Sequence, residues 1–105
     1  MTDLCLQPAT ELAELLRTRQ VSARELLEAC LARVDEVDPV LNAVVVRDDE
    51  RARARAAELD ELIVRSGPVG PLHGLPTAHK DLLDTAGLPT SYGSRAFAGN
   101  VPRRD

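Results

Sequence analysis

The sequence predicts an α/β fold, in which a helical first part is followed by turns and short extended segments. All six glycines lie in residues 67–105, whereas residues 1–66 contain no glycine and only two prolines. Glycine and proline mark turns, so the first part should be mostly regular helix. A β-branched run at residues 41–46 and two short segments further along the chain supply the predicted strands.

The first two helices are predicted from apolar spacing and from capping residues. Thr10 is the expected N-cap of the first helix. The apolar face of that helix carries three leucines, Leu12, Leu15 and Leu16. The second helix should begin after Ser22, because Ser22 and Glu25 have the spacing of a capping box. Its apolar positions run at helical spacing as far as Val37, and Pro39 is expected to end it.

A strand and a third helix are predicted next. Leu41 to Val46 is too short for a helix and is predicted as a buried strand. The third helix should begin at Asp48 and Asp49, because acidic residues suit a helix N-terminus. Gly67 is its expected C-cap. The apolar stripe of this helix consists of Ala52, Ala56, Leu59, Leu62 and Ile63.

The remaining residues are predicted to alternate between turns and short strands. Residues 69–73 are expected as a loop and residues 85–90 as a turn, with strands at residues 75–79 and 91–94. Two or three strands with three helices do not close a sheet, and exposed sheet edges are a liability. We therefore expect the chain to be a truncated part of a larger sheet protein.

Composition excludes several classes of protein. Hydrophobic residues make up 44% of the 105 residues and charged residues 29%, which indicates a globular rather than a disordered chain. The net charge of -4 argues against a nucleic-acid surface, and no apolar run reaches the roughly 20 residues of a membrane span. Because aromatic residues are nearly absent, the core must use Leu, Val and Ala.

Cysteine and histidine give only weak signals. The two cysteines lack metal-site spacing, so we expect no disulfide framework and a reducing cytoplasm. Cys30 should be a small core residue, and Cys5 an exposed thiol. His73 and His79 could bind a metal with a nearby aspartate. Because no spacing brings them together, packed or solvated histidines are the more frequent outcome.

Lys80 is the main candidate for catalysis. Twelve of the thirteen basic residues are arginines, and Lys80 is the single lysine. Unlike arginine, lysine can lose its proton at accessible pH and act as a base or nucleophile. Two alternatives stay open: the lysine survives by chance, or it forms a structural ion pair with Asp81 or Asp84. Along a strand, His79 and Asp81 would point to the face opposite Lys80.

The glycine-rich part of the sequence resembles the amidase signature family. The resemblance rests on the run from Gly70 to Asp81 (GPLHGLPTAHKD), followed by TAG at residues 85–87 and TSYGS at residues 90–94. Segments 22–26, 37–43 and 100–102 agree with it. The resemblance therefore covers nearly the whole chain, and its combination of motifs is specific.

The resemblance implies a Ser-Ser-Lys amidase. Members of the family hydrolyse or transfer amides with a serine, a second serine on a cis peptide and a lysine, without a metal or organic cofactor. Lys80 matches the lysine, which accepts a proton through the bridging serine. The implied fold is a large mixed sheet between helical layers. The implied partner is a small-molecule amide, and the full-length protein could form a homodimer.

The chain departs from the family pattern in one respect. Both serines lie past Asp105 in the family, and Ser91 and Ser94 match a different stretch of the pattern. We therefore expect residues 1–105 to be the N-terminal portion of a single amidase signature domain. Its helical part is residues 1–66, and residues 67–105 carry Lys80.

Two other functions remain open at this point. One is that of the signature-bearing subunit of a transfer-RNA-dependent amidotransferase, although the wording at residues 84–87 and 92–94 favours a general amidase. The other is a non-catalytic helical binding module derived from an amidase. The sequence does not indicate which amide would be the substrate.

Overall fold

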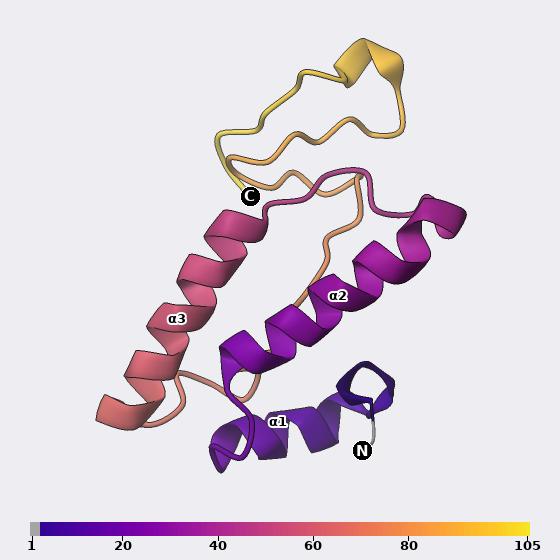
Figure 1. Cartoon of the computed structure of the whole chain (residues 1–105). Helices are drawn as coiled ribbons and strands as arrows, with labels where there is room; N and C mark the ends of the chain where they lie inside the picture. Colours follow the sequence, from indigo (N-terminus) through magenta and orange to yellow (C-terminus); the bar gives the residue numbers. More distant parts are fainter. Residues whose placement is uncertain (1–2) are drawn as a thin grey trace. The chain divides into compact units, whose positions relative to one another are not determined.

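The computed structural model describes residues 3–105, and the regular secondary structure of these residues is helical (Figure 1). The elements in order are the 3-10 turn η1 (Leu4–Leu6), the helices α1 (Ala9–Arg17), α2 (Ala23–Leu41) and α3 (Asp49–Ser66), and the 3-10 turn η2 (Arg95–Phe97). The chain divides into two compact units. We call the chain up to Asn42 with Asp49–Pro76 the helical unit, and Ala43–Asp48 with Thr77–Asp105 the loop unit.

The predicted α/β fold is wrong, because no residue in 3–105 forms a strand. The three predicted strands, at residues 41–46, 75–79 and 91–94, are coil or turn, apart from Leu41 at the end of α2. A strand is defined by hydrogen bonds to a neighbouring strand, and β-branched residues favour that state without supplying the neighbour. Val45 is 68% exposed rather than buried.

The start of α2 follows the prediction, and the start of α1 does not. Ser22 Oγ accepts a hydrogen bond from the Glu25 N–H at 3.0 Å, and the Glu25 carboxylate accepts one from the Ser22 N–H at 3.2 Å. This reciprocal pair is the predicted capping box. Helix α1 instead begins at Ala9, with Pro8 as its N-cap in an extended conformation. Thr10 therefore lies inside the first turn.

Pro39 does not end α2, contrary to the prediction, and the helix continues to Leu41. Proline removes one helical N–H, and in the last turn of a helix that loss interrupts little. The helix ends where Asn42 adopts a left-handed conformation with φ 53°. The Asn42 N–H donates to the Asp38 carbonyl at 2.6 Å, which closes the final turn.

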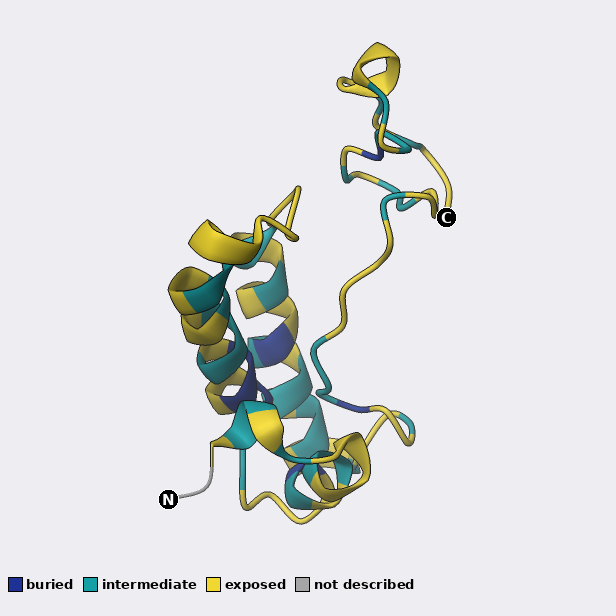
Figure 2. Cartoon of the chain, turned by 90° about the vertical axis from the view of Figure 1, so that its right-hand side faces the viewer, coloured by how far each residue is buried: buried dark blue, intermediate teal, exposed yellow. Residues whose placement is uncertain are grey.

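The core of the helical unit lies mainly between α2 and α3, which run side by side (Figures 1 and 2). Its buried apolar residues are Leu16, Ala23, Leu26, Leu27 and Ala56. Leu26 is fully buried. The core consists of Leu and Ala, as the near-absence of aromatic residues predicts, and such side chains bury less area each than aromatic ones.

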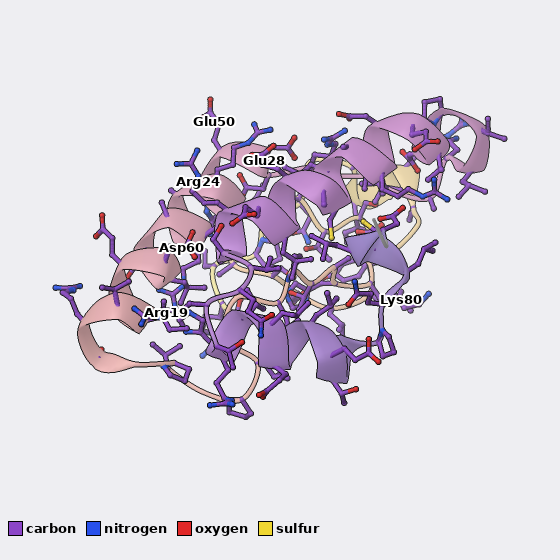
Figure 3. All side chains as sticks on the ribbon, turned by 60° about the horizontal axis from the view of Figure 1, so that its bottom comes forward. Arg19, Arg24, Glu28, Glu50, Asp60 and Lys80 are labelled. Atoms are coloured by element: carbon purple, nitrogen blue, oxygen red, sulfur yellow. The ribbon has the colours of Figure 1, made fainter. Side chains whose placement is uncertain are left out.

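Polar side chains also join α2 to α3 (Figure 3). The Asp60 carboxylate of α3 accepts hydrogen bonds from the N–H groups of Ala23 at 2.7 Å and Arg24 at 3.2 Å. These groups lie in the first turn of α2, where N–H groups lack helical partners. The Arg53 guanidinium donates two hydrogen bonds to the Glu28 carboxylate, at 2.6 and 3.2 Å, and thereby lowers the pKa of Glu28.

After α3 the chain turns back onto the helical core. The Gly67 N–H donates to the Ile63 carbonyl and Gly67 has φ +80°, which confirms it as the C-cap of α3. Gly74, with φ +81°, lies against the core. A Cβ atom at Gly74 would lie 3.1 Å from Leu16 Cδ2 and 3.3 Å from Ala23 Cβ. Leu75 then packs against the core cluster, so this segment closes one side of it.

Candidate active site

Lys80 occupies the first position of a β-turn. The Lys80 carbonyl accepts a hydrogen bond from the Leu83 N–H at 2.9 Å, so Asp81 and Leu82 are the central residues of the turn. The Lys80 side chain is exposed and extends away from the ribbon (Figure 3). Because this segment is not a strand, the expectation that His79 and Asp81 point away from Lys80 on an opposite strand face is wrong.

The ion-pair alternative for Lys80 is not supported. No ion pair joins Lys80 to Asp81 or Asp84 in the part of the chain that the structure describes. The Asp81 carboxylate instead accepts three hydrogen bonds from the 91–93 segment, and Asp84 accepts one from the Tyr92 hydroxyl. Both carboxylates are therefore engaged with groups other than the lysine.

Asp81 ties the Lys80 turn to the segment at residues 91–93. Its carboxylate accepts from the Ser91 N–H at 2.7 Å, the Ser91 hydroxyl at 2.5 Å and the Gly93 N–H at 3.2 Å. Its carbonyl accepts from the Tyr92 N–H at 3.0 Å. The hydrogen bonds from Ser91, hydroxyl first, lower the pKa of Asp81, because they stabilise the charged carboxylate.

Tyr92 strengthens the same segment. It has a left-handed φ of 54°, which is uncommon for a residue other than glycine. Its hydroxyl donates to Asp84, and this hydrogen bond raises the pKa of Tyr92. Its ring meets Phe97 edge to face, with centroids 5.3 Å apart. Asn100 completes the arrangement, because its side-chain amide donates to the Thr90 carbonyl at 3.0 Å.

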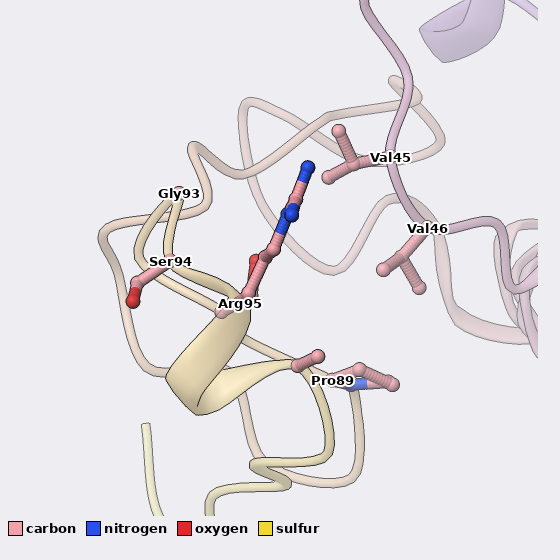
Figure 4. A pocket seen from close by; sticks show the side chains of 8 residues that line it. Val45, Val46, Pro89, Gly93, Ser94 and Arg95 are labelled. Atoms are coloured by element: carbon pink, nitrogen blue, oxygen red, sulfur yellow. The ribbon is translucent and has the colours of Figure 1, made fainter.

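The two serines near Lys80 have structural roles. Ser91 donates its hydroxyl to Asp81, and the Ser94 hydroxyl accepts from the Ala96 N–H at 3.3 Å and caps η2. Both line an open pocket of about 310 Å³ in the loop unit (Figure 4). The Arg95 side chain extends through this pocket toward Val45. A serine nucleophile needs a base that accepts its proton, and the Ser91 hydroxyl is directed to a carboxylate instead.

The histidines and cysteines do not form a metal centre here. His73 is buried, and its Nδ1 accepts a hydrogen bond from the Val69 N–H at 3.1 Å, whereas His79 is exposed. Within residues 3–105, no three His, Cys, Asp or Glu side chains gather where they could hold a metal ion. The same residues contain no helix long and apolar enough to span a bilayer.

The organising role of Asp81 is not apparent from the sequence, which suggests this carboxylate only as a partner of Lys80 or as a metal ligand. Aspartate readily accepts backbone N–H bonds in turns, and a serine and a glycine follow ten and twelve residues later. That spacing alone does not reveal the contact, because the intervening loop decides which groups meet.

Comparison with known proteins identifies the family. The family model described as Amidase matches residues 25–105, a span that includes Lys80 and the whole loop segment after α3. The chain belongs to the amidase family. Two curated relatives illustrate the range of proteins that this amidase chain resembles.

The first relative is a glutamyl-tRNA(Gln) amidotransferase subunit from Acidothermus cellulolyticus. It is 38% identical over 105 residues, which cover 100% of this chain and 21% of that protein. The second is an acylamidase from Rhodococcus erythropolis, 41% identical over 93 residues, or 89% of this chain and 20% of that protein. The amidase chain thus spans about a fifth of the length of these relatives.

A solved structure is similar as well. It belongs to an unexpected vestigial protein complex described as revealing the evolutionary origins of an s-triazine catabolic enzyme. The TM-score is 0.88 at 35% identity, and the match covers 94% of the amidase chain and 22% of that chain. The likeness therefore extends from sequence to backbone.

Proposed function

We propose that this chain contributes the general base, Lys80, to an enzyme that hydrolyses amide C–N bonds. The observation that supports the proposal most directly is the family match over residues 25–105, which includes the single lysine of the chain. Residue usage and the family resemblance point independently to the same side chain. Lysine is also a known base in serine-lysine acyl transfer.

In the proposed reaction, a serine oxygen attacks the amide carbonyl carbon and its proton passes through a bridging serine to the neutral Lys80 amine. The C–N bond then breaks, the amine or ammonia leaves with a proton, and water releases the acid from the acyl-serine. The two serines correspond, by the resemblance, to family positions beyond residues 1–105. The role of Lys80 is to receive and return one proton.

Local structure supports this role for Lys80. The turn at residues 80–83 is held by Asp81 through Ser91 and Gly93, so the backbone that carries the lysine is fixed. Asp81 and Asp84 are occupied by other donors, and their hydrogen bonds leave the lysine amine outside this network. A base that is already paired with a carboxylate would hold its proton more strongly.

The proposal extends to substrate, location and assembly. The substrate would be a small-molecule amide, with no metal or organic cofactor taking part. The protein would act in the cytoplasm, and a longer form would assemble as a homodimer. These points rest on the family resemblance and on the low cysteine content.

A chimeric enzyme tests the assignment of Lys80. Residues 1–105 would replace the matching segment of the Rhodococcus erythropolis acylamidase, to which 93 of them align. In this chimera, Lys80→Ala and Lys80→Arg should each lower kcat by roughly 100- to 10,000-fold, as expected for loss of a general base. Arginine keeps the positive charge but cannot release its proton near neutral pH.

The matched control is Arg103→Ala, which removes an exposed cation from the same unit. It should leave kcat within about twofold of the unmodified chimera, as is usual for a surface change. Thermal unfolding of each variant shows whether the fold persists. An active Lys80→Arg chimera would contradict the catalytic role, because only a structural cation is replaceable in that way.

The 105-residue chain on its own is predicted to hydrolyse no amide. The reason is chemical: the Ser91 and Ser94 hydroxyls are bonded within the loop unit, and acyl transfer needs a nucleophile with a base and oxyanion donors. Purified chain would be incubated with acetamide-like and aryl amides while ammonia or amine release is followed. Turnover that disappears when a residue of this chain is changed would refute the prediction.

A second candidate function is that of a glutamyl-tRNA(Gln) amidotransferase subunit. The observation in its favour is that a protein of that name from Acidothermus cellulolyticus matches the whole chain, at an identity close to that of the acylamidase. Glutamine-dependent amidation by a longer form of the protein, with its partner proteins added, would favour it. Amide hydrolysis without partners would favour the simple amidase. Failure of both assays would favour the non-catalytic binding module.

A further inference from the structure

The two cysteines of the chain lie together in the helical unit, far from the Lys80 turn in sequence. Cys5 is in η1 and Cys30 is in α2, and their Sγ atoms are 3.9 Å apart, with the Cys5 thiol donating toward Cys30. Both are half-buried, which corrects the expectation that Cys5 is an exposed thiol. The amide-hydrolysis proposal uses neither of them.

Local structure holds the two sulfur atoms in this position. The Asp3 carboxylate accepts a hydrogen bond from the Cys5 N–H at 2.9 Å and caps η1, so the backbone of Cys5 is fixed. Leu4 and Cys30 both pack against the buried cluster around Leu26, which seats η1 on α2. The proximity of the thiols therefore follows from a cap and from core packing rather than from one flexible side chain.

We propose that Cys5 and Cys30 form a reversible intramolecular disulfide bond that joins η1 to α2. A disulfide has an S–S length of about 2.05 Å, so each sulfur atom needs to move by only about 1 Å from its present position. The pair is a dithiol in the structure described here. In a reducing compartment it would stay so, and the bond would form when the surroundings become oxidising.

The reaction balances with a small disulfide such as oxidised glutathione as the oxidant. One cysteine thiolate attacks a glutathione sulfur, forms a mixed disulfide and releases one glutathione thiolate. The second cysteine then attacks the protein sulfur of that mixed disulfide, the Cys5–Cys30 bond forms, and the second glutathione leaves. Two protein thiols lose two protons and two electrons, and one oxidised glutathione becomes two reduced molecules.

The two cysteines have different parts in this sequence. Burial raises the pKa of the Cys30 thiol to about 11, and the nearby Cys5 adds to the rise. Because the thiolate is the attacking species, Cys30 is a slow first nucleophile. Cys5 should therefore react with glutathione first, and Cys30 should close the bond once the mixed disulfide lies beside it.

The experiment measures the effective concentration of the two thiols in the full 105-residue chain. The chain is equilibrated in mixtures of reduced and oxidised glutathione, once in native buffer and once in concentrated urea, then acid-quenched and analysed by mass spectrometry. If the fold brings the sulfurs together, the effective concentration in native buffer should exceed that in urea by at least about tenfold, because folding and bond formation are linked.

Variants and products make the result decisive. Cys5→Ser and Cys30→Ser should each stop at a mixed disulfide with glutathione, whereas the unmodified chain should yield a peptide pair linked through Cys5 and Cys30 within one molecule. Equal or lower effective concentration in native buffer would overturn the proposal. So would bonds that join two chains, or glutathione on both cysteines at equilibrium.

Discussion

The helical unit and the loop unit are held together by different kinds of interaction. The helical unit buries a cluster of Leu and Ala side chains between its helices. In the loop unit the one buried side chain among the described residues is that of Thr90, and large apolar residues such as Leu82 and Phe97 are about half exposed. Its order depends on hydrogen bonds to Asp81, Asp84 and Asn100.

Because of this difference, the two units should fail under different conditions. Burial of apolar surface is insensitive to pH and salt, whereas hydrogen bonds to exposed carboxylates weaken when the carboxylates are protonated. Helical circular dichroism should therefore report on the first unit and amide chemical shifts of residues 91–93 on the second. A substitution in one unit leaves the other as an internal reference.

The largest expected effect is that of Leu26→Ala on the helical unit. Leu26 is fully buried, and its truncation should leave a cavity and destabilise the helices by about 3 kcal/mol. Urea unfolding followed by helical circular dichroism measures this change. The matched control is Leu72→Ala in the same unit, where the leucine is 70% exposed and the expected loss is under about 0.5 kcal/mol. Similar losses for the two variants would contradict the proposed core.

An intermediate effect is expected from Asp60→Ala. This change removes the acceptor for two N–H groups in the first turn of α2 and should cost about 1–2 kcal/mol, as loss of a helix cap does. The same unfolding experiment measures it. Glu61→Ala, at an exposed neighbouring position, provides the control. If both variants unfold at the same urea concentration, the link from α3 to α2 contributes nothing in solution.

The smallest effect on the helices, and the most local, is expected from Asp81→Ala. Loss of the carboxylate should shift the amide resonances of Ser91 and Gly93 and speed their hydrogen exchange several-fold, while helical circular dichroism stays unchanged. Acid should have the same result. Because the pKa of Asp81 is lowered in the folded state, its contribution is present above the ordinary aspartate pKa of about 3.9 and is lost as pH falls through the lower folded value.

A titration of the Ser91 and Gly93 amide shifts checks the sign of this pH dependence. The shifts should stay constant from neutral pH down to about pH 4 and change below it. A midpoint above the ordinary aspartate range would show that the carboxylate is not stabilised by these donors.

Local signals predicted the helices well and the rest of the fold poorly. The capping box at Ser22, the acidic start of α3 and the Gly67 cap are encoded within a few residues, and the structure confirms all three. The strands failed because a strand needs a partner that a single segment does not specify. Pro39 misled because its effect depends on how near the helix end already lies.

The candidate site shows the same division between local and distant information. Lys80 is singled out by residue usage and by the motif around it, and its catalytic role stays a prediction. The contacts of Asp81 with Ser91 and of Asp60 with Ala23 join residues 10 and 37 positions apart, and no pattern in the sequence announces them. Such contacts depend on the path of the intervening chain.

The placement of Gly74 has a consequence for how this sequence can change over generations. Any side chain at position 74 would adopt an unfavourable positive φ and press its Cβ atom against Leu16. A shorter residue at position 16 would relieve the contact but would open a cavity in the core when it arose first. The two positions are therefore epistatic: each single step lowers fitness through stability, and only a paired replacement, with a residue that tolerates the left-handed backbone, opens a route between sequences.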